Sequence, residues 1–142
     1  MKINLKVFTD KLFRMPTQAT SGSAGWDVYS LEDIALPPGQ MKIIPCGFGL
    51  EIPTNYYVSI VPRSSFGKKL IWLPNSPATI DSDYRGEIHV MLMNLSQDQF
   101  YIKAHDRIAQ LILHQYNHME FNVVDQFTQT NRGEGGFGST GR

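Results

Sequence analysis

Short apolar-rich segments run along most of this chain of 142 residues, and in two of them every second residue is apolar. A period of two is typical of β-strands that bury one face, and residues 3–7 and 88–93 show it most clearly. The pattern predicts further short strands at residues 26–30, 41–44, 48–52, 56–61, 107–113 and 119–124. Only residues 63–70 have the composition of a short helix, which Gly67 disfavours.

Proline and glycine separate the predicted strands, at Pro37-Pro38-Gly39, Pro45 and Pro53-Thr54-Asn55. Many short strands with turns of this kind are typical of an all-β sandwich or barrel. A chain of this length forms one domain with a sizeable core, and we expect Trp26 to fill part of that core.

The charge balance and the single cysteine narrow the choice of partners and location. The 13 basic and 13 acidic residues give no electrostatic case for nucleic acid or a membrane surface as the partner. Cys46 alone cannot form a disulfide within the chain, and we expect it to be a small buried hydrophobic residue. No signal peptide or membrane-length apolar run is visible, so we expect a soluble, cytoplasmic protein.

The glycine-rich segment 132–142 is the first candidate for chemistry. Its five glycines let the backbone approach a ligand closely, and Arg132, Ser139 and Thr140 add donors suited to phosphate. Phe137 is an aromatic ring that can stack on a base. A G-x-G-x-x-G pattern lies within the segment, but a dinucleotide site would need a helix after it. The alternative is a disordered terminus.

The segment 79–87 holds two carboxylates. In an extended chain Asp81 and Asp83 point to the same face, where a carboxylate can act as a general base towards water. The alternative is a polar β-turn. Residues 62–69 combine an arginine, two serines and two lysines, which suit either a phosphate site or a solvated basic turn.

Together, and in this order, five segments resemble the motifs of the dUTPase family (deoxyuridine triphosphate nucleotidohydrolases) of the homotrimeric type. The matching segments are Ala24-Gly25-Trp26-Asp27, Pro62-Arg63-Ser64-Ser65, residues 80–86, Arg107-Ile108-Ala109-Gln110 and residues 132–138. The third and fifth motifs are specific, and the five span nearly the whole chain.

The resemblance implies an all-β, jelly-roll-like distorted barrel in residues 1–124 and a flexible C-terminal arm in residues 125–142. It also implies a homotrimer in which one site takes motifs from three chains. The implied reaction is Mg²⁺-dependent hydrolysis of dUTP to dUMP and pyrophosphate, which keeps uracil out of DNA and supplies dUMP for thymidylate synthesis.

The resemblance also assigns roles to single residues. Asp81 matches the carboxylate that activates water for attack on the α-phosphorus. Asp27 and Gln110 would order waters on Mg²⁺, with no direct protein ligand. The residues implied for uracil and deoxyribose are Asn75, Ala78, Thr79, Ile80, Tyr84 and Phe137. Those implied for phosphate are Arg63, Ser64, Ser65, Gln110, Arg132, Gly138, Ser139 and Thr140.

Two departures and two alternatives accompany this assignment. Trp26 is bulkier than the residue expected in the first motif. The family often has glycine where Ala78 stands, and alanine would cost about 1 kcal/mol there if φ were positive. The first alternative is a dCTP deaminase, a family that shares the fold. That family has a glutamate three residues before the asparagine that matches Asn94, and this chain has Met91 at that position. A non-catalytic or regulatory nucleotide-binding trimer is the other alternative, and the retained Asp81, Arg63 and Gln110 disfavour it.

Overall fold

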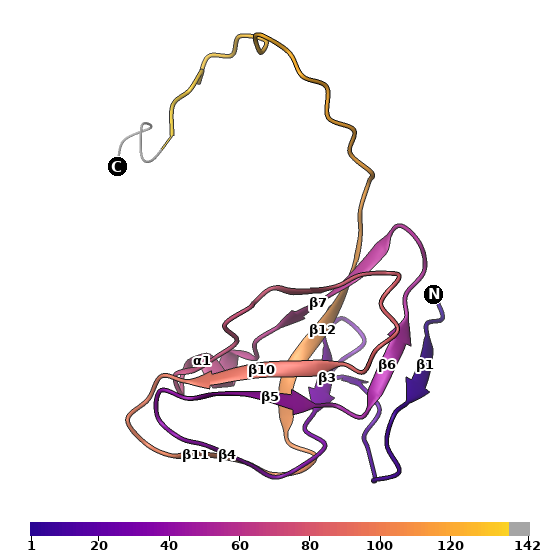
Figure 1. Cartoon of the computed structure of the whole chain (residues 1–142), viewed down its shortest axis with the longest axis vertical. Coiled ribbons are helices and arrows are strands. Elements are labelled where there is room, and N and C mark those ends of the chain that lie inside the picture. Colours follow the sequence, from indigo (N-terminus) through magenta and orange to yellow (C-terminus); the bar gives the residue numbers. More distant parts are fainter. Residues whose placement is uncertain (137–142) are drawn as a thin grey trace.

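The computed structural model describes residues 1–136, and nearly all of their regular structure is β-strand (Figure 1). The strands in this range are β1 (Asn4–Val7), β2 (Thr17–Gln18), β3 (Trp26–Tyr29), β4 (Ile34–Leu36), β5 (Met41–Pro45), β6 (Phe48–Glu51), β7 (Tyr56–Val61), β8 (Ile71–Trp72), β9 (Ala78–Ile80), β10 (His89–Asn94), β11 (Phe100–Ile102) and β12 (Arg107–Gln115). The only helix among these residues, α1 (Ser64–Gly67), is one turn long. No helix in the described range is long and apolar enough to cross a membrane.

The strands pair antiparallel and enclose one core, which confirms the predicted all-β, jelly-roll-like barrel. The largest sheet has the order β2-β3-β12-β7-β9, and a second has the order β5-β10-β8. The pairs β1–β6 and β11–β4 close the remaining sides (Figure 1). Each sheet turns one apolar face inwards, as a period of two requires.

The core is made of large aliphatic side chains and one phenylalanine that are almost completely buried. They are Val28, Leu36, Ile44, Phe48, Ile60, Ile71, Leu73, Ile88, Val90, Leu92, Ile102 and Ile108. Asn94 is also fully buried, and its amide nitrogen donates to the carbonyl oxygens of Leu36 and Asp98, both at 2.8 Å. These bonds satisfy a buried polar group and tie the end of β10 to β4.

The structure confirms seven of the eight strands predicted from the sequence, with bounds that differ by at most two residues. Strands β2, β4, β8, β9 and β11 were not predicted, because two or three residues are too few to show a period. The helix predicted at residues 63–70 is confined to Ser64–Gly67.

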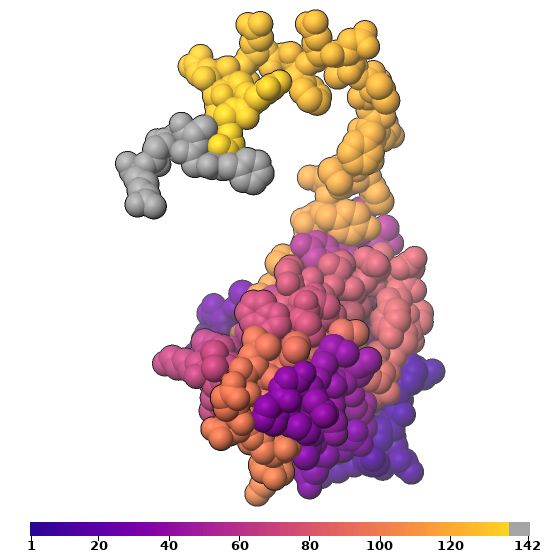
Figure 2. Space-filling view, turned by 60° about the vertical axis from the view of Figure 1, so that its left-hand side comes forward, coloured from indigo at the N-terminus to yellow at the C-terminus, as the bar shows by residue number. Residues whose placement is uncertain are grey.

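The strand predicted at residues 119–124 is wrong. After β12 the described chain has no further strand and runs clear of the barrel (Figures 1 and 2). Phe121 and Val123 are 89% and 95% exposed, so their alternation has no sheet to pack on within one chain. An alternating pattern becomes a strand only where another strand offers backbone partners. The division at residues 124 and 125 stays a prediction.

The prediction that Trp26 fills the core is also wrong for the single chain. Its side chain is 45% exposed and lines an apolar surface hollow together with Met15, Leu50 and Leu111. Trp26 is the first residue of β3, and its neighbour β2 is only two residues long. Trp26 is exposed and the three residues that follow it in β3 are buried, so the buried part of the strand begins one residue after Trp26.

Cys46 is buried, as predicted, and its thiol is held in the neutral form. The side chain is 2% exposed. Burial, with a smaller contribution from the charge of Glu87, raises the pKa of the Cys46 thiol from 9.0 to about 12.

This pKa predicts a loss of stability in alkali. Above pH 9 the unfolded chain releases the thiol proton, whereas the folded chain keeps it up to about pH 12. The free energy of unfolding of the wild type should therefore fall as the pH rises above 9. The thiol adds about 1.4 kcal/mol per pH unit to this slope, and Cys46→Ala should lack that contribution. Urea unfolding at several pH values measures both slopes, and identical slopes would contradict the prediction.

Candidate active site

A buried carboxylate on β3 organises the first part of the site. Asp27 is 2% exposed, and its Oδ1 accepts hydrogen bonds from Arg63 Nε at 3.1 Å and Gln110 Nε2 at 3.3 Å. Arg107 Nη1 donates to Oδ2 at 3.4 Å. A buried charge is stable only when it is paired and hydrogen-bonded. These four residues therefore form one unit, the Asp27 cluster.

The central strand β12 brings the cluster together. Gln110 lies opposite Asp27 of β3 on one side and opposite Val61 of β7 on the other. Arg63 follows Val61 by two residues and returns to the same face of the sheet, where it reaches Asp27. Segments 83 residues apart in the sequence thus meet at one point.

A β-bulge adds Arg107 to the cluster. The register between β12 and β3 shifts between Arg107 and Ala109, so that Arg107 lies opposite Tyr29 while Gln110 lies opposite Asp27. Without this extra residue, Arg107 and Gln110 would point to opposite faces of the strand. Arg107 was not among the phosphate-binding residues predicted from the sequence. Strict alternation along a strand would place Arg107 on the face opposite to Gln110.

Gly25 leaves the space that Gln110 occupies. A Cβ atom at this position would lie 3.2 Å from Cδ and 3.3 Å from Oε1 of Gln110. These contacts are tight, so a side chain at position 25 would require the Gln110 side chain to shift by a few tenths of an ångström.

A cavity of about 260 Å³ opens beside the cluster. Its basic residues are Arg63, Lys69 and Arg107, its hydroxyl residues are Ser65 and Tyr101, and Asp106 is its one acidic residue. Arg63 Nη1 also donates to Ser65 Oγ at 3.4 Å. The excess of positive charge and the N–H and O–H donors suit an oxyanion such as phosphate.

The second part of the predicted site lies on β9, at the edge of the same sheet. Ala78 pairs with Ile60 and Ile80 with Val58, while Thr79 is exposed. Within the described residues β9 has a partner strand on one side only, so its outer backbone groups are available to a ligand. Asn75, which precedes this strand, is exposed.

Alanine at position 78 fits the backbone. Among residues 1–136 the non-glycine residues with positive φ are Asn55, Leu70 and His105. Ala78 is a strand residue outside this set, so replacing glycine carries no cost from φ.

Asp81 and Asp83 lie in a turn and not in an extended strand. The backbone nitrogen of Tyr84 donates to the carbonyl of Asp81 at 3.2 Å, and both carboxylates are exposed. The interpretation of this segment as a polar β-turn is therefore confirmed. Asp81 stands at the end of β9, where its side chain is open to solvent.

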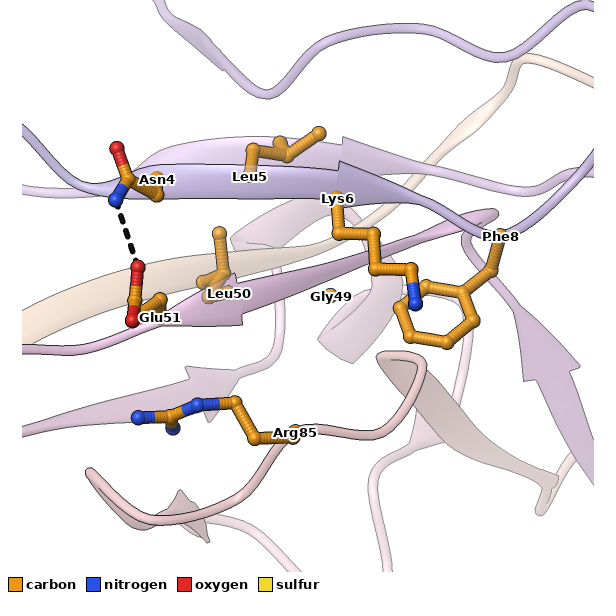
Figure 3. Close-up of a pocket in the computed structure, with 8 residues that line it drawn as sticks. All are labelled: Asn4, Leu5, Lys6, Phe8, Gly49, Leu50, Glu51 and Arg85. Carbon is orange, nitrogen blue, oxygen red and sulfur yellow. Dashed lines mark hydrogen bonds between the residues drawn. The ribbon is translucent and has the colours of Figure 1, made fainter.

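Arg85 holds this turn in place. Its Nη1 donates to the carbonyl oxygens of Ser82 at 2.6 Å and Tyr84 at 2.9 Å. Figure 3 shows its side chain along the wall of a surface pocket of about 280 Å³, beside Glu51 and Leu50 of β6. The turn that carries Asp81 is thus fixed by side-chain bonds on the side that faces β6.

Gly86 and Glu87 fix the ring of Tyr84, and neither residue was assigned a role from the sequence. The Tyr84 hydroxyl donates to the carbonyl of Glu87 at 2.9 Å. The Glu87 carboxylate accepts a hydrogen bond from the backbone of Gly47 at 2.8 Å. A Cβ atom on Gly86 would overlap the Tyr84 hydroxyl, so only glycine permits this ring position.

One chain does not bring the two parts of the site together. Strand β7 gives a common reference for the two parts. Ile80, which precedes Asp81, pairs with Val58 of β7, whereas Gln110 of the Asp27 cluster pairs with Val61 of β7. Three strand spacings and three to four residues along the strands separate them, roughly 15–20 Å.

Of the predicted residues of the last motif, Arg132 is the one that the structure describes. Arg132 is exposed, and its Nε donates to the carbonyl of Gly135 at 2.8 Å. Phe137, Gly138, Ser139 and Thr140 lie outside the described residues.

The cluster offers oxygen atoms to a hydrated metal ion. Among residues 1–136 no three His, Cys, Asp or Glu side chains converge on a possible metal site. The Gln110 amide nitrogen faces Asp27, which leaves its Oε1 as an acceptor for water. Such oxygens suit Mg²⁺, which keeps several of its waters.

Comparison with known proteins gives consistent matches along the chain. The dUTPase family model matches residues 11–141. The deoxyuridine 5'-triphosphate nucleotidohydrolase of Nautilia profundicola is 43% identical over 143 residues, which cover 100% of this chain and 100% of that protein. The protein of the same name from Zymomonas mobilis is 46% identical over 127 residues, which cover 89% of this chain and 87% of that protein.

Solved structures share the fold. The dUTPase of Staphylococcus bacteriophage 80alpha with dUPNHPP has a TM-score of 0.87 at 24% identity, with 99% of each chain covered. A mutant dUTPase from phage phi11 of S. aureus, described for its coordination of a structural Mg(II) ion, has a TM-score of 0.81 at 19% identity. It covers 89% of this chain and 99% of that chain.

The cluster predicts a large stability effect at Asp27. The Arg63 side chain is only 22% exposed. In the variant Asp27→Ala it loses the carboxylate that compensates its charge. We expect the free energy of unfolding to fall by about 3 kcal/mol, measured by urea denaturation. Asp10→Ala, an exposed control, should change it by less than about 0.5 kcal/mol. Equal stabilities of the two variants would show that the cluster does not hold β3 to β12.

Proposed function

The chain belongs to the dUTPase family, and from this premise we propose how its residues share the hydrolysis of dUTP. The protein is a dUTP diphosphatase, which converts dUTP to dUMP and pyrophosphate. The observation that carries the proposal is the Asp27 cluster, which presents two arginines at the edge of a basic cavity.

The cluster and the start of α1 bind the triphosphate. Asp27 compensates one of the two guanidinium charges, so Arg63 and Arg107 together keep one net positive charge for the phosphates. The hydroxyls of Ser64 and Ser65 and the amide of Gln110 add uncharged groups. Arg132, Gly138, Ser139 and Thr140 complete the phosphate contacts from the last motif.

Mg²⁺ is the cofactor that this donor set fits. Asp27 and Gln110 would hold its water molecules through carboxylate and amide oxygens, and no protein atom would bind the ion directly. When bound, the ion makes the α-phosphorus more electrophilic.

Asp81 acts as the general base. Its carboxylate accepts one proton from a water molecule, whose oxygen forms a bond to the α-phosphorus. The bond between that phosphorus and the bridging oxygen breaks, and pyrophosphate leaves. The bonds from Arg85 keep the turn, and therefore the carboxylate, in position during this step.

Uracil and deoxyribose bind along the outer edge of β9. The free backbone groups of residues 78–80 pair with the base edge, and Asn75 adds an amide contact. A methyl group at C5 would clash with this close fit, and a cytosine would leave polar groups unpaired. Tyr84 packs on the sugar and leaves no room for a 2′-hydroxyl, while Phe137 stacks on the base.

The complete site needs more than one copy of the chain. Asp81 and the Asp27 cluster are separated within one chain, and the described chain after β12 runs clear of the barrel (Figure 1). A homotrimer in which neighbouring copies supply these parts resolves the separation. Deamination is not proposed, because Met91 offers no carboxylate.

The role of Asp81 predicts a defect in the chemical step. Asp81→Asn should lower kcat for dUTP by about 10³-fold, since the amide cannot accept the proton. Its affinity for the analogue dUPNHPP should stay within about threefold, because the phosphate contacts are intact. Pyrophosphate release in the presence of Mg²⁺ gives kcat, and calorimetry gives the affinity.

Asp83→Asn is the matched control, since Asp83 is an exposed carboxylate in the same turn and should retain nearly full kcat. Full activity of Asp81→Asn would place the base elsewhere.

The wild type should hydrolyse UTP, dTTP and dCTP at least about 100-fold less efficiently than dUTP. Comparable efficiencies would refute the proposed nucleotide contacts.

The packing of Tyr84 on Gly86 predicts a second, more selective defect. In Gly86→Ala the new methyl group displaces the tyrosine ring, so the ratio of kcat/KM for dUTP to that for UTP should fall about tenfold or more. Gly22→Ala is the control, because nothing lies within 4 Å of its Cβ position. An unchanged ratio in Gly86→Ala would exclude Tyr84 as the group that rejects the 2′-hydroxyl.

A further inference from the structure

Lys69 is the third basic residue on the wall of the cavity that opens beside the Asp27 cluster. It follows the end of α1 by two residues, and its backbone nitrogen donates to the carbonyl oxygen of Phe66 at 3.0 Å. Its Nζ lies over the ring of Phe100, 5.5 Å from the ring centroid. Because Phe100 also lines the cavity, this contact holds the ammonium group at the cavity wall.

Two aromatic side chains fix the position of this ammonium group. Phe66 is 6% exposed and packs edge-to-face on Phe100, with the ring centroids 5.7 Å apart. Phe100 belongs to β11, where it pairs with Leu36 of β4. The ring under the ammonium group is therefore anchored both by a buried neighbour and by its own strand.

Lys69 has no acidic partner in the part of the chain that the structure describes. No ion pair among residues 1–136 includes it. Asp106 lines the same cavity, but its Oδ2 accepts a hydrogen bond from the backbone nitrogen of Lys103 at 2.9 Å. A cation held by an aromatic ring and not by a carboxylate can bind an anionic ligand.

The balance of formal charges gives Lys69 its importance in the cavity. Arg63 and Arg107 carry two positive charges, and both side chains are bonded to Asp27. Asp27 and Asp106 carry two negative charges, so these four residues leave no net charge. The positive charge that remains in the cavity therefore comes from Lys69. Without it, the cavity would offer a polyphosphate hydrogen bonds but no net electrostatic attraction.

The position of the proposed base indicates which phosphates enter the cavity. The α-phosphorus has to meet the water held by Asp81, which lies outside the cavity and away from the Asp27 cluster. The α-phosphate is therefore at the mouth, and the two phosphates beyond it extend into the cavity. A volume of about 260 Å³ has room for both groups.

We propose that Lys69 binds the pyrophosphate part of the substrate, the β- and γ-phosphates that leave together. This inference rests on the proposed function and names a further contact of the same site. These two phosphates carry most of the negative charge of dUTP, whereas dUMP lacks both of them. The ammonium group therefore favours the binding of dUTP and of pyrophosphate over that of dUMP.

Removal of the charge tests the proposal. Lys69→Gln should raise KM for dUTP about tenfold and leave kcat within about threefold, because the same contact is lost from the bound substrate and from the transition state. Calorimetry should show an affinity for dUPNHPP about tenfold lower and an affinity for dUMP within about twofold of the wild type. Lys69→Arg keeps the charge and should stay within about threefold of the wild type in every constant.

Lys68→Gln is the matched control. Lys68 is the exposed neighbour of Lys69 and does not line the cavity, so this variant should behave as the wild type. Equal affinities of Lys69→Gln and the wild type for dUPNHPP would overturn the proposal. The same loss of affinity for dUMP as for dUPNHPP, or an equal loss in Lys68→Gln, would also overturn it.

A variant with the opposite effect covers the case in which Lys69→Gln fails to fold. Asp106→Asn removes the acidic residue of the cavity, and its amide oxygen can still accept the bond from the Lys103 backbone. The affinity for dUPNHPP should rise about threefold, since the net positive charge of the cavity increases. An unchanged or lower affinity would show that the charge of this cavity does not bind the phosphates.

Inorganic pyrophosphate separates this inference from the proposed function, because its binding needs neither uracil nor Asp81. A wild type that does not hydrolyse dUTP, but binds pyrophosphate about tenfold more tightly than Lys69→Gln does, would refute the function and support the role of Lys69. Hydrolysis of dUTP by the wild type, together with equal binding of pyrophosphate by both proteins, would refute the role of Lys69 alone.

Discussion

The pairing of β12 with a strand on each side is the constraint on which the rest of the structure depends. Its nine residues join β3 to β7, and Ile108, Ala109 and Leu111 from this strand enter the core. The other face carries Gln110 into the Asp27 cluster. A slip of one residue would exchange the two faces, exposing the core residues and burying the polar ones. The same hydrogen-bond ladder therefore sets the packing of the core and the geometry of the site.

The cluster shows how a charge is accommodated in such a sheet. Asp27 is buried, which is unfavourable for a lone carboxylate, and three donors compensate it, two from β12 and one from the segment after β7. The arrangement also restrains Arg63 and Arg107 before any substrate arrives. Side chains that are already ordered lose less conformational entropy on binding a phosphate. The same contacts therefore stabilise the sheet and order the arginines of the phosphate site before substrate binds.

Two features of the isolated chain are incomplete, and assembly resolves both. The carboxylate proposed as the base lies across the sheet from the phosphate-binding cluster. The outer face of β5-β10-β8 is apolar and open, as are Phe121 and Val123 beyond β12. A barrel of this size can bury one core, but these surfaces lie outside it. Contacts between copies would cover apolar area and complete the catalytic constellation in a single step.

The sequence by itself determined the all-β class, the longer strands, the buried Cys46 and the five motifs, because alternation, turn residues and local chemistry are properties of neighbouring residues. It did not determine the short strands, the exposure of Trp26 or the fate of residues 119–124, because these depend on which strands lie alongside. The tertiary structure alone decided that Arg107 shares a face with Gln110, through a bulge that breaks the alternation. It also decided that Asp81 and Asp27 stay apart in one chain, because strand order and register set distances that no local pattern records.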